Sequence, residues 1–177
     1  MSEPLQALIV MLCGLTIFSD LYAHRVRNAW LLSALLLGIG LVSWPWAKGM
    51  AGPPWSSVVG LLVGLGALLP FYIAGWMGAG DVKFFATLGF LLGGEALLPI
   101  WIIASLISGV HAVVVVVARQ LNFLASDPVA SAQAQSRESR LWQRVMTARQ
   151  GRKGIPYAAY MAIGALFTLY APNVVHW

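Results

Sequence analysis

Six apolar stretches, separated by short polar segments, constrain this chain more than any other feature of its sequence. They cover residues 5–19, 29–44, 56–76, 82–92, 97–118 and 155–171. A helix needs roughly 20 mostly apolar residues to cross a bilayer. We therefore predict an all-α, polytopic membrane protein with about six transmembrane helices, which form a single membrane-embedded domain over residues 1–177.

The composition supports lipid as the solvent of this chain. Of its 177 residues, 59% are hydrophobic and only 10% are charged, whereas soluble domains have about 25% charged residues. The N-terminus lacks a basic region and a small-residue cleavage site, so the first stretch is expected to be a retained span. Because Cys13 is the single cysteine, the sequence predicts no internal disulfide and no cysteine-based metal site. We expect no metal and no organic cofactor.

The basic residues predict which side of the membrane each loop occupies. With six spans, ten of the eleven lysines and arginines fall on one side, and only Lys48 falls on the other. Basic residues accumulate in cytoplasmic loops. Both termini should therefore lie outside the cytoplasm, in a multi-pass protein of the cell inner (cytoplasmic) membrane. Because topology explains the charge of +5, we expect membrane lipids as partners and no nucleic acid.

The basic cytoplasmic loop at about 119–153 is the one long polar segment. Asp127 followed by Pro128 is typical of a helix start. The arginines that follow alternate with apolar residues, which would suit an amphipathic helix on an anionic membrane surface. A flexible solvated loop fits the same residues, and both interpretations stay open.

Small residues predict where helices approach one another closely. Gly60 and Gly64 form a small-xxx-small pair within the third stretch, and further glycines lie at Gly38, Gly40 and Gly66. Such residues let the backbones of membrane helices come into contact. These five positions are therefore expected to lie at helix interfaces.

Two aspartates carry the chemistry that the sequence predicts. Of six acidic residues, only Asp20 and Asp81 lie where a span meets the predicted cytoplasmic face. Charged groups at such positions are costly and tend to be functional or paired. Two carboxyl groups brought together can hydrolyse a peptide bond, one activating water as a base and the other donating a proton. No serine, cysteine or histidine set competes.

The residues around Asp81 leave two interpretations open. Gly78 and Gly80 precede it within the segment GAGDVK. Glycines permit a sharp turn and the close approach of another chain, as a protease needs for an extended substrate. The same segment could be a turn that enters a helix with Asp81 as its N-cap.

Three segments, taken together, resemble the type IV prepilin peptidases. GAGDVK at 78–83 matches their GxGDxK motif. DLYAHRVRN at 20–28 is similar to their first-aspartate motif, although Arg27 stands where proline is usual. KGIPYAA at 153–159 is similar to the segment that begins their last span. The resemblance extends over nearly the whole chain.

The resemblance implies a membrane aspartic protease that removes the basic leader from type IV prepilins or pseudopilins at the cytoplasmic face. Asp20 and Asp81 would be the catalytic pair, and Gly78 and Gly80 would shape the site. The remaining motif residues would be structural or substrate-facing: Asn28, Lys83, Pro156 and Tyr157. The substrate would present its leader and its apolar N-terminal helix.

The size of the chain refines the resemblance. Larger relatives add a cytoplasmic domain with four cysteines that methylates the new N-terminus, whereas this chain has one cysteine and a short first loop. We therefore expect cleavage without methylation, as in the small CpaA/TadV-type enzymes that process Flp-type pilins. Archaeal preflagellin peptidases are also small.

A function of another class remains as an alternative. A small transporter or a scaffold subunit of a secretion machine could also place acidic residues at a membrane edge. In a transporter, His111 in the fifth stretch could serve a proton relay, although packing between helices is the simpler interpretation. The two halves of the chain show no convincing internal repeat, which the transporter hypothesis would predict.

Overall fold

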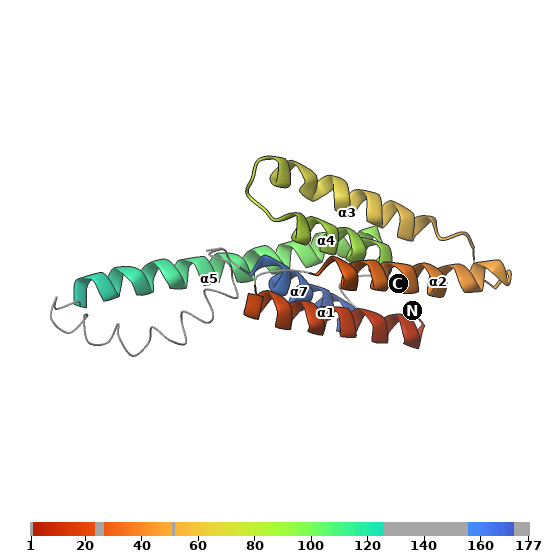
Figure 1. Ribbon diagram of the computed structural model, residues 1–177, viewed down its shortest axis with the longest axis horizontal. Helices are drawn as coiled ribbons and strands as arrows, with labels where there is room; N and C mark the ends of the chain where they lie inside the picture. The colour runs from red at the N-terminus through yellow and green to blue at the C-terminus, as the bar shows by residue number, and fades with distance from the viewer. Residues whose placement is uncertain (1, 24–26, 51, 126–155, 172–177) are drawn as a thin grey trace.

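The computed structural model describes residues 2–23, 27–50, 52–125 and 156–171 (Figure 1). Within these residues all regular structure is helical, so the predicted all-α fold is confirmed. The elements are α1 (Glu3–Ala23), α2 (Asn28–Ala47), α3 (Trp55–Ile73), α4 (Ala79–Leu92), the short 3₁₀ helix η1 (Gly94–Ala96), α5 (Leu97–Ala125) and α7 (Tyr157–Tyr170).

The helices fall into two groups by length. Four described segments are long and apolar enough to cross a membrane: Glu3–Tyr22, Asn28–Ala47, Trp55–Ile73 and Gly94–Ala118. The other two helices, α4 and α7, have 14 residues each, or about 21 Å at 1.5 Å per residue. The hydrocarbon core of a bilayer is ~30 Å thick. A helix therefore occupies each predicted stretch, and the count of six complete spans stays a prediction.

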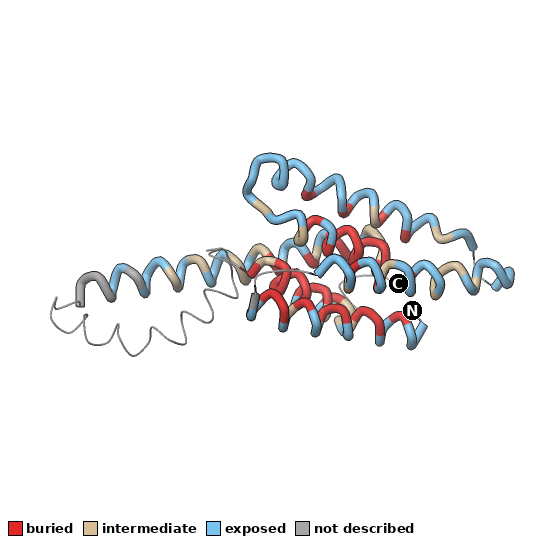
Figure 2. The backbone as a smooth tube through the Cα atoms, in the orientation of Figure 1, coloured by how far each residue is buried: buried red, intermediate tan, exposed pale blue. Residues whose placement is uncertain are grey.

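Helix α4 lies at the centre of the bundle. It packs against each of the five other α-helices described, and every residue from Phe84 to Leu92 is buried. Figure 2 shows the buried backbone concentrated where α1, α4 and α7 meet. A helix that is apolar on all sides is expected to be buried on all sides. The motif residue Asp81 therefore belongs to the most enclosed helix of the described structure.

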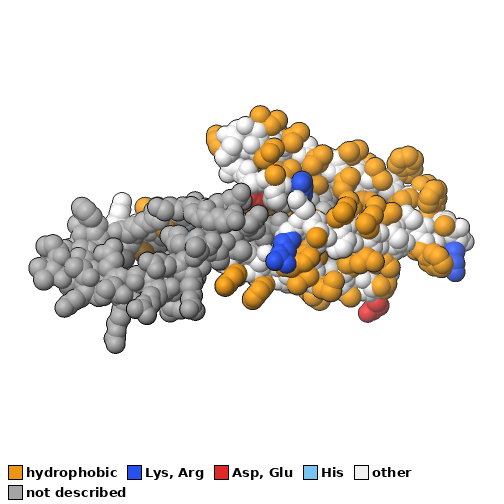
Figure 3. Space-filling model, viewed as in Figure 1, with side chains coloured by type: hydrophobic (Ala, Val, Ile, Leu, Met, Phe, Trp, Pro, Cys, Tyr) orange, Lys and Arg blue, Asp and Glu red, His pale blue; other side chains and the backbone are white. Residues whose placement is uncertain are grey.

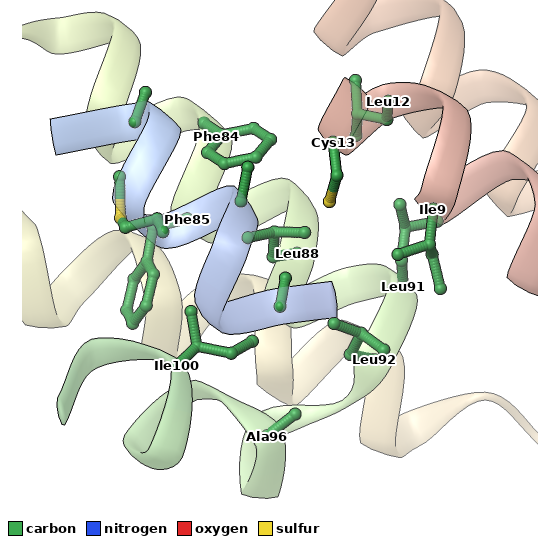
Figure 4. Close-up of a cluster of buried hydrophobic side chains, with 14 of the residues drawn as sticks. Ile9, Leu12, Cys13, Phe84, Phe85, Leu88, Leu91, Leu92, Ala96 and Ile100 are labelled. Atoms are coloured by element: carbon green, nitrogen blue, oxygen red, sulfur yellow. The ribbon is translucent and has the colours of Figure 1, made fainter. Parts of the chain in front are cut away.

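The core brings together side chains from distant parts of the sequence. Figure 4 shows Cys13 of α1, Leu88 of α4 and Ile100 of α5 pointing toward α7, with other large apolar side chains around them. Each of these three side chains is fully buried. By contrast, much of the visible outer surface of α1, α2 and α3 is apolar (Figure 3). Exposed leucines, valines and tryptophans fit a lipid environment.

Glycine contacts join α3 directly to α4. A Cβ atom on Gly60 would collide with the carbonyl oxygen of Gly89, and one on Gly64 would lie 2.9 Å from the Cα of Ala86. The predicted small-xxx-small pair therefore does mark a backbone-to-backbone contact. Gly38 also lies against α4, at the side chain of Leu91.

The expectation that all five glycines lie at helix interfaces was wrong at two positions. Among the described residues, a Cβ atom on Gly40 or Gly66 would meet nothing within 4 Å, so neither glycine lies at an interface between the described helices. The fifth apolar stretch was expected to end at residue 118, and the segment apolar enough to cross a membrane ends there, while helix α5 itself continues to Ala125. The predicted helix start at Asp127 lies outside the described residues.

The α3–α4 contact provides a test of the packing. In Gly60→Ala the added methyl group forces the two backbones apart, and overpacking of this kind typically costs about 1–3 kcal/mol. We expect a lower thermal midpoint for the detergent-solubilised variant. Gly66→Ala is the matched control, because it adds the same methyl group to α3 in open space. Equal midpoints for the two variants would contradict the direct glycine contact.

Candidate active site

The chain enters the candidate site through a turn at the end of α3. The backbone N–H of Trp76 donates to the carbonyl of Phe71, and that of Gly75 donates to Tyr72. Gly75 has φ +75°, which a residue without a side chain adopts at least cost. These bonds form a Schellman motif, which ends a helix and reverses the chain. The aromatic rings of Phe71 and Trp76 pack across this turn.

Asp81 lies in the first turn of α4, at its third residue. Gly78 is the N-cap, and its backbone N–H donates to Oδ2 of Asp81 over 3.2 Å. This is one half of a capping box, because glycine has no side chain to return the bond. Of the two open interpretations, the one with Asp81 as the N-cap does not hold, since the helix begins two residues earlier.

Gly78 also keeps space for the carboxyl group of Asp81. A Cβ atom at position 78 would lie 3.2 Å from Oδ2 of Asp81, which is closer than ordinary contact. Gly80 lies half-buried in the same turn. The first glycine of the GAGDVK segment thus supports the site through its N–H group and through its missing side chain.

Asp20 lies near the end of α1 and is only 5% exposed. Its Oδ2 accepts a hydrogen bond of 2.9 Å from the backbone N–H of Ala159, within the buried interior. Ala159 is the third residue of α7, where N–H groups have no partner within the helix. Asp20 therefore caps α7 from another helix, 139 residues away in the chain. Both this N–H group and the positive end of the helix stabilise negative charge.

The structure brings Asp20 and Asp81 together. Burial raises the pKa of Asp81, the negative charge of Asp20 raises it further, and the hydrogen bond from Gly78 opposes both, with a result of about 6. The ordinary value is 3.8. Asp81 stands at the start of α4, outside the four long apolar segments. One carboxyl group can act on the pKa of another in this way only when the two are close.

Two further motif residues, Asn28 and Lys83, meet beside the pair. The Nζ atom of Lys83 donates to Oδ1 of Asn28 over 3.4 Å, and both side chains are exposed. This contact joins the starts of α2 and α4. Residues two apart on a helix point in different directions. Its contact with Asn28 directs the side chain of Lys83 toward α2.

The last motif residues, Pro156 and Tyr157, form the start of α7. Pro156 is the buried N-cap of this helix, and Tyr157 is half-buried at its first position. The hydroxyl of Tyr157 shares a hydrogen bond of 3.2 Å with Oγ of Ser105 on α5. Burial raises the pKa of Tyr157, the bond with Ser105 lowers it, and the charge of Asp81 raises it. The first turn of α7 therefore lies within reach of both aspartates.

A second polar contact joins α7 to α5. The hydroxyl of Tyr160 and Nδ1 of His111 are 2.7 Å apart. His111 therefore packs against a neighbouring helix, as the simpler sequence interpretation had it. Burial raises the pKa of Tyr160, and the charge of Asp20 raises it further, so Tyr160 lies near Asp20.

Sequence reasoning missed Ser105, Ala159 and Tyr160. A signal existed for Ser105: together with Ser108 and His111 it forms a polar series at intervals of three residues within the otherwise apolar stretch 97–118. Residues spaced in this way lie on one side of a helix, and polar groups inside apolar segments usually find partners on neighbouring helices. Ala159 had no such signal, because its contribution is a backbone N–H group.

The arrangement supplies two carboxyl groups in unlike surroundings. One is buried and bonded to the start of a helix, and the other is shifted toward the protonated state. Such a pair can combine a general base with a general acid. Among the described residues, no group of three or more histidines, cysteines and acids could hold a metal ion.

The fold and the site thus define a helical membrane protein with two adjoining aspartates at the ends of helices. Comparison with known families assigns it more closely. Residues 7–113, more than half of the chain, match the type IV leader peptidase family. The chain belongs to this family, which implies type IV leader peptidase activity on prepilin substrates. No curated protein matches the chain, and no solved structure matches it.

The coupling of the two carboxyl groups can be measured by titration. The chain has three aspartates, so ¹³C-labelled aspartate gives few signals, which Asn variants can assign. We expect Asp81 to titrate at about 6 in the wild type. In Asp20→Asn the neighbouring negative charge is gone, so the pKa of Asp81 should fall. It should stay above 3.8, because burial persists.

Glu95→Gln provides the control for this titration. It also removes one negative charge, but from an exposed residue in η1. This variant should leave the Asp81 titration where it is. An unchanged pKa of Asp81 in Asp20→Asn would mean that the two groups are not neighbours.

Proposed function

We propose that this chain is an aspartic endopeptidase that removes the basic leader from type IV prepilins or pseudopilins, with Asp20 and Asp81 as its catalytic pair. The observation that carries the proposal is the buried carboxyl group of Asp20, which is bonded to the start of α7 and whose charge also acts on the carboxyl group of Asp81. These are also the two aspartates of the segments that resemble the family motifs. Both lie within the residues matched to the family.

The unlike surroundings of the two groups assign their roles. Asp20 receives a hydrogen bond from Ala159 at the start of α7, which favours its ionised form. Burial and the neighbouring charge favour the protonated form of Asp81. Asp20 is therefore the general base and Asp81 the general acid, with one proton held between them.

The reaction follows from these roles. A water molecule attacks the carbonyl carbon of the scissile bond while Asp20 takes one of its protons. Asp81 gives its proton to the carbonyl oxygen, and a neutral tetrahedral intermediate results. Proton transfer to the amide nitrogen then breaks the carbon–nitrogen bond. The leader leaves with a new carboxyl group and the mature chain with a new amino group.

The finer features of the function rest on the sequence. The basic residues place the site at the cytoplasmic face of the inner membrane, with both termini on the other side. Small size and a single cysteine favour cleavage without methylation, on a Flp-type pilin, as in the small enzymes that the chain resembles. Asn28 and Lys83 support the site from the α2–α4 contact.

Co-expression with a prepilin tests the catalytic pair. Wild type should convert the prepilin to a shorter form on a gel, whereas Asp20→Asn and Asp81→Asn should each lower the rate by about 10²–10⁴-fold, the usual contribution of a general acid or base. Glu95→Gln, an exposed charge in η1, should cleave normally. Membrane levels of all four proteins are compared by immunoblot.

Normal cleavage by either Asn variant would remove that aspartate from the mechanism. A wild type that inserts fully but cleaves no type IV prepilin or pseudopilin would favour the non-enzymatic alternative.

The cleaved pilin tests the absence of methylation. Since the sequence has a single cysteine, whereas the methylating domain of the family carries four, the new N-terminus should carry an unmodified amino group. Mass spectrometry of the mature pilin, made in cells without another prepilin peptidase, measures this directly. A product heavier by one methyl group would show that the chain also acts as a methyltransferase.

A further inference from the structure

A serine of α5 lies at the edge of the site without a part in the mechanism described so far. Ser105 is half-buried, and its Oγ lies 3.2 Å from the hydroxyl of Tyr157. Tyr157 stands in the first turn of α7, the turn whose Ala159 N–H group binds Asp20. The Ser105–Tyr157 contact therefore joins α5 to the helical turn that binds Asp20.

Attachment of α7 to α5 does not require this hydrogen bond. The two helices are already joined by the shorter contact between Tyr160 and His111, at 2.7 Å. They also touch through backbone atoms, because a Cβ atom on Gly164 would lie 2.9 Å from the carbonyl oxygen of Ile100. The Ser105 contact is therefore one of several between the two helices, and it is the one that involves the hydroxyl of Tyr157.

Electrostatics decides which way that hydroxyl group points. A charge on Asp81 acts on the hydroxyl of Tyr157, so the two groups lie near one another. The aspartate pair keeps one negative charge when it holds one proton, and an O–H dipole beside that charge directs its proton toward the pair. The lone pairs of the tyrosine oxygen then face Ser105, whose hydroxyl rotates freely to donate. In this arrangement Ser105 donates to Tyr157, and the proton of Tyr157 faces the aspartates.

From this geometry we propose that Ser105 is a positioning residue for leader cleavage, which orients the hydroxyl of Tyr157 toward the scissile carbonyl group. The proposal rests on the proposed peptidase function. When water adds to the carbonyl carbon, negative charge develops on the carbonyl oxygen. A preorganised O–H donor stabilises that charge, and Asp81 completes the proton transfer. Tyr157 would thus assist the acid without exchanging a proton itself.

Kinetics of leader cleavage by the full-length protein in detergent tests the proposal. Tyr157→Phe keeps the ring and removes the donor, so kcat should fall by about 10²-fold, as for a lost oxyanion-stabilising donor, with KM little changed. Ser105→Ala leaves the tyrosine hydroxyl in place but free to turn, and kcat should fall by about tenfold, the value of one hydrogen bond. Ser105→Thr retains a hydroxyl and should restore most of the rate.

Ser108→Ala is the matched control, since it makes the same substitution one turn further along α5, at another half-buried serine. It should leave kcat unchanged. The decisive measurement is the double variant. If Ser105 acts through Tyr157, Ser105→Ala should cost nothing further in the Tyr157→Phe background.

If Ser105→Ala lowers kcat by the same factor in the wild-type and Tyr157→Phe backgrounds, the positioning role is overturned. The same holds if Ser105→Ala changes only KM or the thermal midpoint. A fully active Ser105→Ala beside an active wild type would overturn it as well, while leaving the aspartate pair intact. If the wild type itself fails to cleave, the proposed function fails and this inference fails with it. The outcomes are therefore distinguishable.

Discussion

The hydrogen bond from the backbone of Ala159 to the carboxyl group of Asp20 is the interaction on which the site depends. It joins the end of α1 to the start of α7, two segments 139 residues apart. A buried carboxyl group without such a donor would be strongly unfavourable. The start of α7 would in turn have an unpaired N–H group. Each element therefore supplies a hydrogen-bond partner to the other, and this contact helps to set the position of Asp20.

The position of Asp81 depends on a different interaction, the close packing of other helices around the short helix α4. Helix α4 is surrounded by the other described helices, and the glycines of α3 let it approach to backbone contact. Small-residue contacts of this kind are common where lipid supplies no hydrophobic drive for association. The buried face of α4 holds Asp81 near Asp20, while Gly78 leaves room for its carboxyl group.

The two carboxyl groups therefore have different surroundings, which favour different protonation states. Asp20 is held by a helix start, whereas Asp81 experiences burial and the charge of its neighbour. Their unlike surroundings assign the two roles, because the shared proton stays on the group whose protonated form is favoured. The first turn of α7 joins the arrangement on its other side through Tyr157 and Ser105. Helix α7 thus contributes through its backbone and through a side chain.

The sequence by itself determined the all-α class, the approximate helix positions and the two aspartates. In lipid every backbone polar group must be satisfied within its own segment, so apolar stretches become helices for a local reason. Charged side chains at a membrane edge are costly and therefore rare, so Asp20 and Asp81 could be identified from the sequence. Only the tertiary structure decided that α1 meets α7, that Ser105 reaches Tyr157, and that no other described helix packs against Gly40 or Gly66. Those features depend on how the helix faces fit together, and a backbone N–H group such as that of Ala159 has no side chain through which the sequence could reveal it.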